Sequence, residues 1–182
     1  EPDFLAISPM GKVPVLETVH GFLTETDAIL DYLDEAYPAT ALFPADPFAR
    51  AKVRQLMKTQ ELYVESPAHE LIGALFGREV PPHIIASSQP AVSKGLAAVG
   101  RLAQFSPWIA GSDFSNADIL VYYSLTLSNR LTQLVYQWDI LPEVLGMQDW
   151  FARMETREVT ARIMADNKAA NDARLASRNQ VS

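Results

Sequence analysis

The sequence predicts an α+β fold in which a short β-hairpin and one helix precede a region made only of helices. Two short apolar runs within residues 13–24 lie on either side of His20 and Gly21, and a glycine between two such runs is typical of a hairpin. After residue 25, apolar side chains recur at helical spacing, which predicts helices joined by loops.

Length, composition and charge narrow the class of protein. The chain has 182 residues, 48% hydrophobic and 20% charged, which is ordinary for a folded protein and excludes intrinsic disorder. The net charge is −7 without a run of Lys and Arg, so nucleic acid and membranes are not expected as partners. No apolar run is long enough to span a bilayer. Cysteine is absent, which suits a cytoplasmic protein.

The predicted hairpin lacks partners within the sequence. A lone hairpin is marginal in water because its edges and one face stay uncovered. Since the chain after residue 25 predicts only helix and loop, we expect further strands upstream of Glu1. The opening EPDFLAISP is expected to be the approach to a strand.

A first helix is predicted over residues 28–37, directly after the hairpin. Thr24 and Asp27 have the spacing of a capping box. Ile29 and Leu33 can face the same side of this helix.

Prolines then separate two regions. Pro38, Pro44 and Pro47 fall within ten residues, and such a cluster between periodic segments indicates a linker. Asp46 and Pro47 suit the N-cap and first turn of a longer helix. The predicted units are 1–38, the linker 39–46 and the all-helical 47–182.

Further breaks and helices are predicted from prolines and periodicity. The breaks are expected at Pro67, where the helix kinks or ends, and at Pro81, Pro82 and Pro90. After them we expect an apolar stripe over 92–103, a loop over 107–111, a helix starting within 139–142, one or two helices over 150–165, and a frayed tail from Asn167.

The clearest local signal is FSNADI. Ser115 and Asp118 form a capping box, with Phe114 and Ile119 at the positions of a hydrophobic staple. We expect a helix to start at Ser115 and assign this motif to stability.

Candidate binding residues cluster near the hairpin. A cis Val13–Pro14 bond would leave the Val13 backbone free to pair with an extended peptide. The helix start near Thr26 favours an anion, and Lys12 could meet a second carboxylate. Each also has an ordinary explanation, as turn geometry, a self-satisfied cap or a solvated lysine. The three histidines lack metal-ligand spacing, so no metal site is expected.

The segments SPMGKVPVLE and FLTETDAILDYLDEAYP resemble the second half of the thioredoxin-like domain of soluble glutathione S-transferases. The resemblance continues through LFPADPFARAKVRQL into an all-helical domain, where FSNADI is similar to that family's capping motif. It covers residues 4–165.

The resemblance implies a glutathione site and a function. Val13, before a cis Pro14, would pair with the cysteinyl part of glutathione, Glu25 and Thr26 would hold its γ-glutamyl end, and Lys12 would meet its glycyl carboxylate. The implied reaction transfers glutathione, as a co-substrate, to a small electrophile in a homodimeric enzyme without a metal. The catalytic residue stays unknown, because the family's sulfur-activating Ser, Tyr or Cys falls in a region that would precede Glu1.

Other possibilities stay open. Tyr63 is a candidate for the substrate pocket, although an aromatic residue on an amphipathic helix more often belongs to the core. The same scaffold could serve as a non-catalytic interaction or dimerisation module. A glutathione-dependent disulfide reductase would need a cysteine in the missing segment.

Overall fold

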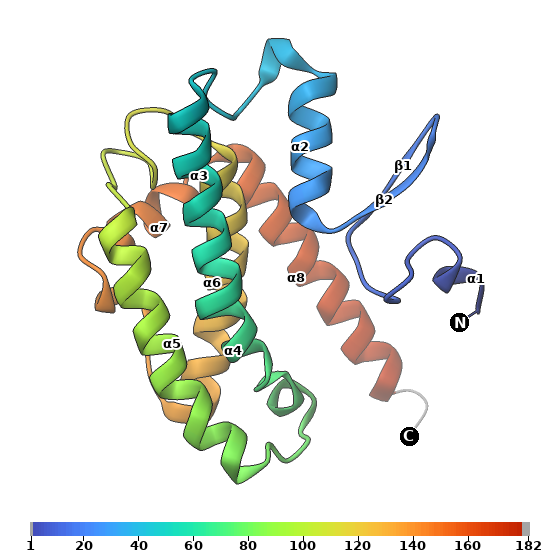
Figure 1. Ribbon diagram of the computed structural model, residues 1–182. Coiled ribbons are helices and arrows are strands. Elements are labelled where there is room, and N and C mark those ends of the chain that lie inside the picture. Colours follow the sequence, from blue (N-terminus) through green and yellow to red (C-terminus); the bar gives the residue numbers. More distant parts are fainter. Residues whose placement is uncertain (1, 180–182) are drawn as a thin grey trace.

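A computed structural model describes the backbone of residues 2–179 and the side chains of 3–170, 172 and 173. A hairpin and one helix lie beside a bundle of longer helices (Figure 1), so the predicted α+β order is confirmed. The short elements η1, η3 and η4 are 3₁₀ helices and η2 is a π-helix. In chain order the elements are α1 (Pro2–Leu5), β1 (Val15–Thr18), β2 (Gly21–Thr24), α2 (Thr26–Ala36), η1 (Pro38–Thr40), α3 (Pro47–Gln60), η2 (Glu61–Glu65), α4 (Ser66–His69), η3 (Ile72–Phe76), α5 (Pro82–Leu102), α6 (Asn116–Tyr136), η4 (Leu141–Glu143), α7 (Met147–Glu155) and α8 (Glu158–Asn179).

The predicted hairpin is confirmed, with its turn at Val19 and His20. Strands β1 and β2 are antiparallel, and Val15 pairs with Thr24 at the end far from the turn. The Thr18 hydroxyl donates to the Gly21 carbonyl at 2.8 Å and closes the turn. Gly21 has a φ of 125°, a conformation that side chains disfavour. Within residues 2–179 the sheet has these two strands only.

The opening of the chain differs from the prediction. A turn of helix, α1, precedes the approach to the first strand. Pro2 suits a first helical turn and Asp3 lies at its positive end, and these two residues favour the helical turn over an extended approach.

The long helix from Pro47 starts as predicted and changes form before Pro67. The Asp46 side chain accepts a hydrogen bond from the Ala49 amide at 2.8 Å. From Glu61 to Glu65 the helix widens into the π-turn η2, and Pro67 lies in the first turn of α4. Proline has no amide hydrogen for an i−4 bond. A Cβ on Gly95 would lie 1.9 Å from the Tyr63 carbonyl oxygen, so α5 packs directly on this backbone.

Three predictions about the helical region are wrong in part. Pro90 lies inside α5 and does not break it; this residue is exposed, so water can reach the carbonyl that it leaves unbonded. The predicted helix start within 139–142 is only a 3₁₀ turn, and α7 begins at Met147. The tail from Asn167 continues α8 to Asn179, and the last three residues lie outside the described part.

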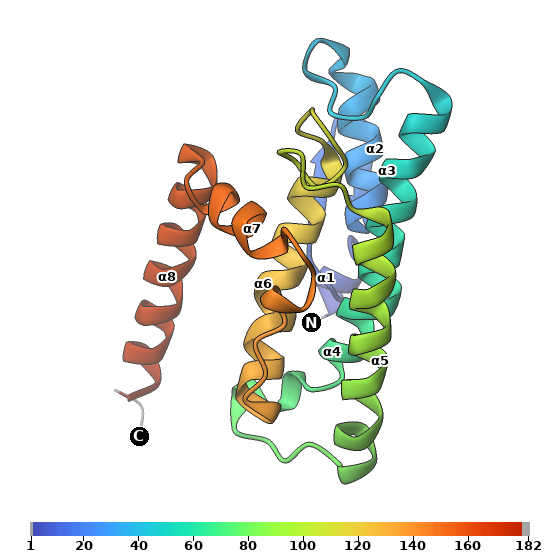
Figure 2. The ribbon, with the colours of Figure 1, turned by 90° about the vertical axis from the view of Figure 1, so that its left-hand side faces the viewer.

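The larger of two buried apolar clusters unites the bundle. Helices α3, α5 and α6 run side by side, while α8 stands to one side and is joined to the bundle through α7 (Figure 2). Leu56 on α3, Leu96 on α5, Leu125 on α6 and Trp150 on α7 are at most 2% exposed. Leu30 of α2 packs against the same core, so the amino-terminal elements are seated on the bundle.

Candidate functional site

Pairing of the two strands brings the predicted binding residues together. Val15 and Thr24 are opposite each other in the ladder. The segment ending in Pro14 therefore enters the hairpin beside the point where Glu25 leaves it. The side chains of Lys12, Val13, Pro14, Glu25 and Thr26 are all exposed at this end.

A buried serine shapes the loop that carries Lys12. Ser8 is 1% exposed. Its hydroxyl donates to the Lys12 carbonyl at 2.7 Å and accepts from the Lys12 amide at 2.9 Å. This role was not predicted from the sequence, in which its only signal is a small polar residue before Pro9, at the start of a turn.

The Val13–Pro14 peptide bond is cis, as the resemblance implies. The Val13 side chain is 79% exposed, and no hydrogen bond within the described part of the chain engages its backbone.

The start of α2 is uncapped, so the predicted Thr24–Asp27 capping box is wrong. Thr24 ends β2, and Glu25 is the N-cap without a side-chain hydrogen bond to the helix. Glu25 has a φ of 66° and a ψ of 120°, an unfavourable backbone conformation for a residue with a side chain. The first amides of α2 thus remain available at the positive end of the helix, an arrangement suited to an anion.

Asp27 turns away from its own helix because it meets Lys58 on α3. The Asp27 Oδ2 atom lies 2.6 Å from Lys58 Nζ, which is also 2.6 Å from Glu61 Oε2. Hydrogen bonds to Asp27 and Glu61 raise the pKa of Lys58 above its ordinary value. Lys58 therefore stays charged near neutral pH.

This contact is one of three ion pairs between α2 and α3. On each helix the charged residues recur at spacings of three or four and face the other helix. The pairs are Asp27–Lys58 at 2.6 Å, Asp31–Arg54 at 2.7 Å and Asp34–Arg50 at 3.7 Å.

Asp34 also anchors the segment between α2 and α3. Its side chain is 4% exposed, and Oδ1 accepts hydrogen bonds from the amides of Leu42 and Phe43. The buried Asp34 carboxylate thus holds the segment 39–46, which the proline cluster indicates as a linker, against the end of α2.

Tyr63 lies in a different groove. Its side chain is 58% exposed and lines a hollow of about 650 Å³ between the η2–α4 segment and α5. None of the five residues at the hairpin end lines this hollow. The structure therefore does not bring Tyr63 together with them.

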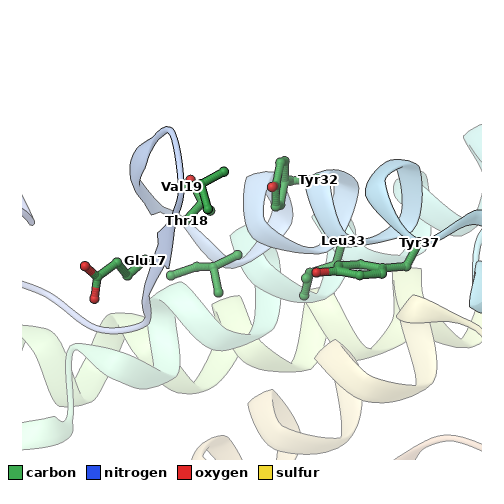
Figure 3. A pocket seen from close by; sticks show the side chains of 7 residues that line it. Glu17, Thr18, Val19, Tyr32, Leu33 and Tyr37 are labelled. Atoms are coloured by element: carbon green, nitrogen blue, oxygen red, sulfur yellow. The ribbon is translucent and has the colours of Figure 1, made fainter.

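A second hollow, of about 620 Å³, lies between β1 and α2. Figure 3 shows Val19 and Tyr32 above it, with Leu33 and Tyr37 side by side along α2. Glu17 is its only charged lining residue. Its lining combines apolar side chains with Glu17, Thr18 and two tyrosines, and among the described residues the outer edge of β1 has no strand partner.

Ser115 and Asp118 form the predicted capping box at the start of α6. Asp118 is fully buried, and its carboxylate accepts from the Ser115 amide at 2.8 Å, the Ile109 amide at 2.9 Å and Trp150 Nε1 at 2.8 Å. A fully buried carboxylate that three protein groups hold in place suits the stabilising role expected of this motif.

The described residues contain no group of three or more His, Asp or Glu side chains placed to hold a metal ion. Likewise, no helix within 2–179 has the length and hydropathy to cross a membrane.

Comparisons with known proteins agree with this architecture. Residues 1–41 match the family model of the glutathione S-transferase amino-terminal domain. A glutathione S-transferase of Pseudomonas putida is 40% identical over 173 residues, which cover 94% of this chain and 79% of the relative. A maleylacetoacetate isomerase of Pseudomonas aeruginosa is 28% identical over 166 residues, 81% of this chain and 71% of that protein. The crystal structure of a glutathione S-transferase from Rhodospirillum rubrum superposes with a TM-score of 0.69 at 27% identity, covering 88% of this chain and 73% of that one.

A hairpin with its helix, followed by a helical bundle, thus defines a thioredoxin-like amino-terminal part and an all-helical carboxy-terminal part. The chain belongs to the glutathione S-transferase family.

Proposed function

We propose that this protein binds glutathione at the hairpin end and transfers it to a small, largely apolar electrophile. The observation that carries the proposal is the meeting of Lys12, Val13 and Pro14 with the uncapped start of α2 at Glu25 and Thr26. Family membership favours this ligand over other short peptides with two carboxylates.

Each residue has a role that its position suits. The exposed backbone of Val13 pairs with the cysteinyl part of glutathione, as in strand addition. Glu25, the Thr26 hydroxyl and the first amides of α2 hold the γ-glutamyl end. Lys12 attracts the glycyl carboxylate.

The reaction forms a bond between the glutathione sulfur and an electrophilic carbon, whose leaving group departs with its electron pair. A group that lowers the pKa of the thiol makes the reactive thiolate available near neutral pH. We assign no residue of this chain to that step. The residues at the hairpin end hold and orient glutathione. Tyr63 stays a prediction for the substrate pocket, without support from its place in a separate groove.

Calorimetry with glutathione tests the binding role. Thr26→Ala removes a hydrogen bond to a carboxylate and is expected to weaken binding by roughly 1–3 kcal/mol. Thr156→Ala is the matched control, because this exposed hydroxyl at the end of α7 bonds only the Arg153 carbonyl. Equal affinities of Thr26→Ala and the unaltered protein would refute the assigned role.

We further propose that the protein is cytoplasmic and that each chain consists of an amino-terminal unit (1–38), a linker (39–46) and an all-helical unit (47–182). We also propose that two copies of the chain form a homodimer. The exposed Leu62 and Tyr63, at 53% and 58%, support an apolar contact, and Glu70 and Lys94 line the same groove. Leu62→Glu should lower the mass measured by light scattering from dimer to monomer. A monomer already in the unaltered protein would contradict the proposal.

A second candidate reaction comes from the isomerase relative, whose name indicates action on maleylacetoacetate. Assays with this compound and with an activated aryl halide distinguish isomerisation from conjugation.

If the protein is instead a non-catalytic interaction module, we expect no glutathione binding at all. The disulfide reductase still requires a cysteine, and the 182 residues have none.

A further inference from the structure

The first turn of α2 contains a carboxylate that could cap its own helix and does not. Asp27 is the second residue of α2, next to the free amides of Thr26 and Ala28. Aspartate near a helix start readily accepts hydrogen bonds from neighbouring backbone amides. Here its Oδ2 atom is bound to Lys58 on α3 instead, at 2.6 Å.

The second oxygen of Asp27 shows the cost of this orientation. Oδ1 is buried and has no hydrogen-bond partner, although unpaired amides lie at the same helix end. Leaving both an acceptor and nearby donors unsatisfied is unfavourable. The ion pair with Lys58 therefore decides where the carboxylate lies.

Lys58 is well placed to hold that position. Glu61 binds the same ammonium group at 2.6 Å from the next turn of the helix, which restricts the lysine side chain. The Lys58 side chain is 51% exposed, and such a pair contributes little to the stability of a protein. Its main effect is on the direction of Asp27.

We propose that Lys58 is a positioning residue: by drawing the Asp27 carboxylate toward α3, it keeps the first amides of α2 free for the carboxylate of a bound ligand. Lys58 also offsets the negative charge of Asp27 beside an anion site. The identity of the ligand rests on the proposed function, whereas the competition between Asp27 and the ligand for the amides does not.

Glutathione affinity is the first test. In Lys58→Met, Asp27 is free to occupy the amides, and we expect binding to weaken about five- to tenfold. Lys58→Arg keeps the positive charge and should retain the glutathione affinity of the unaltered protein. Adding Asp27→Ala to Lys58→Met removes the competing carboxylate and should bring affinity back to within about twofold of the unaltered protein.

Arg54→Met is the matched control, since it breaks the neighbouring pair with Asp31 on the same two helices. This variant should bind glutathione as the unaltered protein does. Equal losses in Arg54→Met and Lys58→Met would mean that the pairs only hold the two helices in register, and would overturn the proposal. A double variant that binds no better than Lys58→Met would also overturn it.

Amide hydrogen exchange, measured by NMR without glutathione, separates this inference from the proposed function. In Lys58→Met, exchange at Thr26, Asp27 or Ala28 should slow about threefold or more, because Asp27 now caps the helix. In Arg54→Met it should not change. Unchanged exchange in Lys58→Met overturns the positioning role. The expected slowing, with no glutathione binding by the unaltered protein, would instead refute the proposed function alone.

Discussion

Two helices of this protein begin in opposite ways. At the start of α6, a buried Asp118 accepts hydrogen bonds from Ser115, Ile109 and Trp150. At the start of α2, Glu25 provides no cap, and Asp27 is turned toward another helix. Both starts carry an acidic residue three positions after a Ser or Thr.

The difference teaches that a capping pattern has two uses. Buried amides at a helix start must find partners within the protein, which is the case for α6. Exposed amides can instead form hydrogen bonds with water or with a ligand, which is the case for α2. We infer that the closed start serves stability and the open start serves binding.

The largest expected effect is on the closed start. Asp118→Ala would leave the Ile109 amide, the Trp150 indole and Ser115 without their acceptor, and we expect a loss of roughly 3–5 kcal/mol in the free energy of unfolding. Urea denaturation measures this loss. Asp113→Ala removes an exposed acid of the same loop and should cost less than about 0.5 kcal/mol. A loss below about 1 kcal/mol for Asp118→Ala would break the comparison.

The carboxy-terminal end of α2 is closed by Asp34. Removing this carboxylate should have the second largest effect on the free energy of unfolding. Asp34→Ala leaves the Leu42 and Phe43 amides and Arg50 without their partner. We expect the free energy of unfolding to fall by about 2–4 kcal/mol. Glu35→Ala, at an exposed neighbouring position, is the control in the same denaturation experiment. Similar values for the two variants would show that α2 is open at both ends.

Backbone conformation at the open start gives a smaller effect. Glu25→Gly relieves the φ of 66°, whereas Glu25→Ala removes the same carboxylate and keeps the strain. We expect the glycine variant to unfold with a free energy about 1 kcal/mol higher than the alanine variant. Thermal denaturation measures the difference. If alanine is the more stable of the two, the positive φ does not strain this site.

The smallest effect concerns a buried hydroxyl on α6. The Tyr122 hydroxyl is buried and forms no well-oriented hydrogen bond, and burial raises its pKa more than the nearby Thr126 side chain lowers it. Tyr122→Phe should therefore change the free energy of unfolding by less than about 1 kcal/mol at pH 7. Burial raises the pKa of Tyr122.

A pH series sharpens this prediction. The unfolded chain loses the tyrosine proton near pH 10 while the folded protein keeps it, so stability falls as pH rises above about 10. Tyr122→Phe should reduce that fall. Tyr123 and Tyr136, whose pKa values are also raised by burial, and Lys58, whose pKa is raised by Asp27 and Glu61, should contribute to the remainder. An unchanged alkaline slope in urea denaturation would contradict it.

Sequence patterns predicted those features of the fold that depend on residues close together in the chain. The hairpin, the Asp46–Pro47 helix start and the Ser115–Asp118 capping box follow from turn, capping and periodicity rules, and the structure confirms them. Local rules also produced the errors. Thr24 and Asp27 have the spacing of a cap, and Pro90 has the chemistry of a helix breaker, yet their surroundings decide otherwise.

The binding residues show the same division. Lys12, Val13, Pro14, Glu25 and Thr26 were singled out by motif and resemblance. That they meet at one end of the hairpin follows from the strand register. Ser8 and Lys58 were missed because their partners become neighbours only through a turn or through the packing of two helices.

The sequence by itself determined the order of elements and the identity of the candidate binding residues, because both depend on local backbone preferences and short motifs. Only the tertiary structure decided which helix start is closed and which is open. That choice depends on burial and on the ion pairs of α2 with α3, which join residues far apart in the sequence, such as Asp31 and Arg54 at a separation of 23 positions.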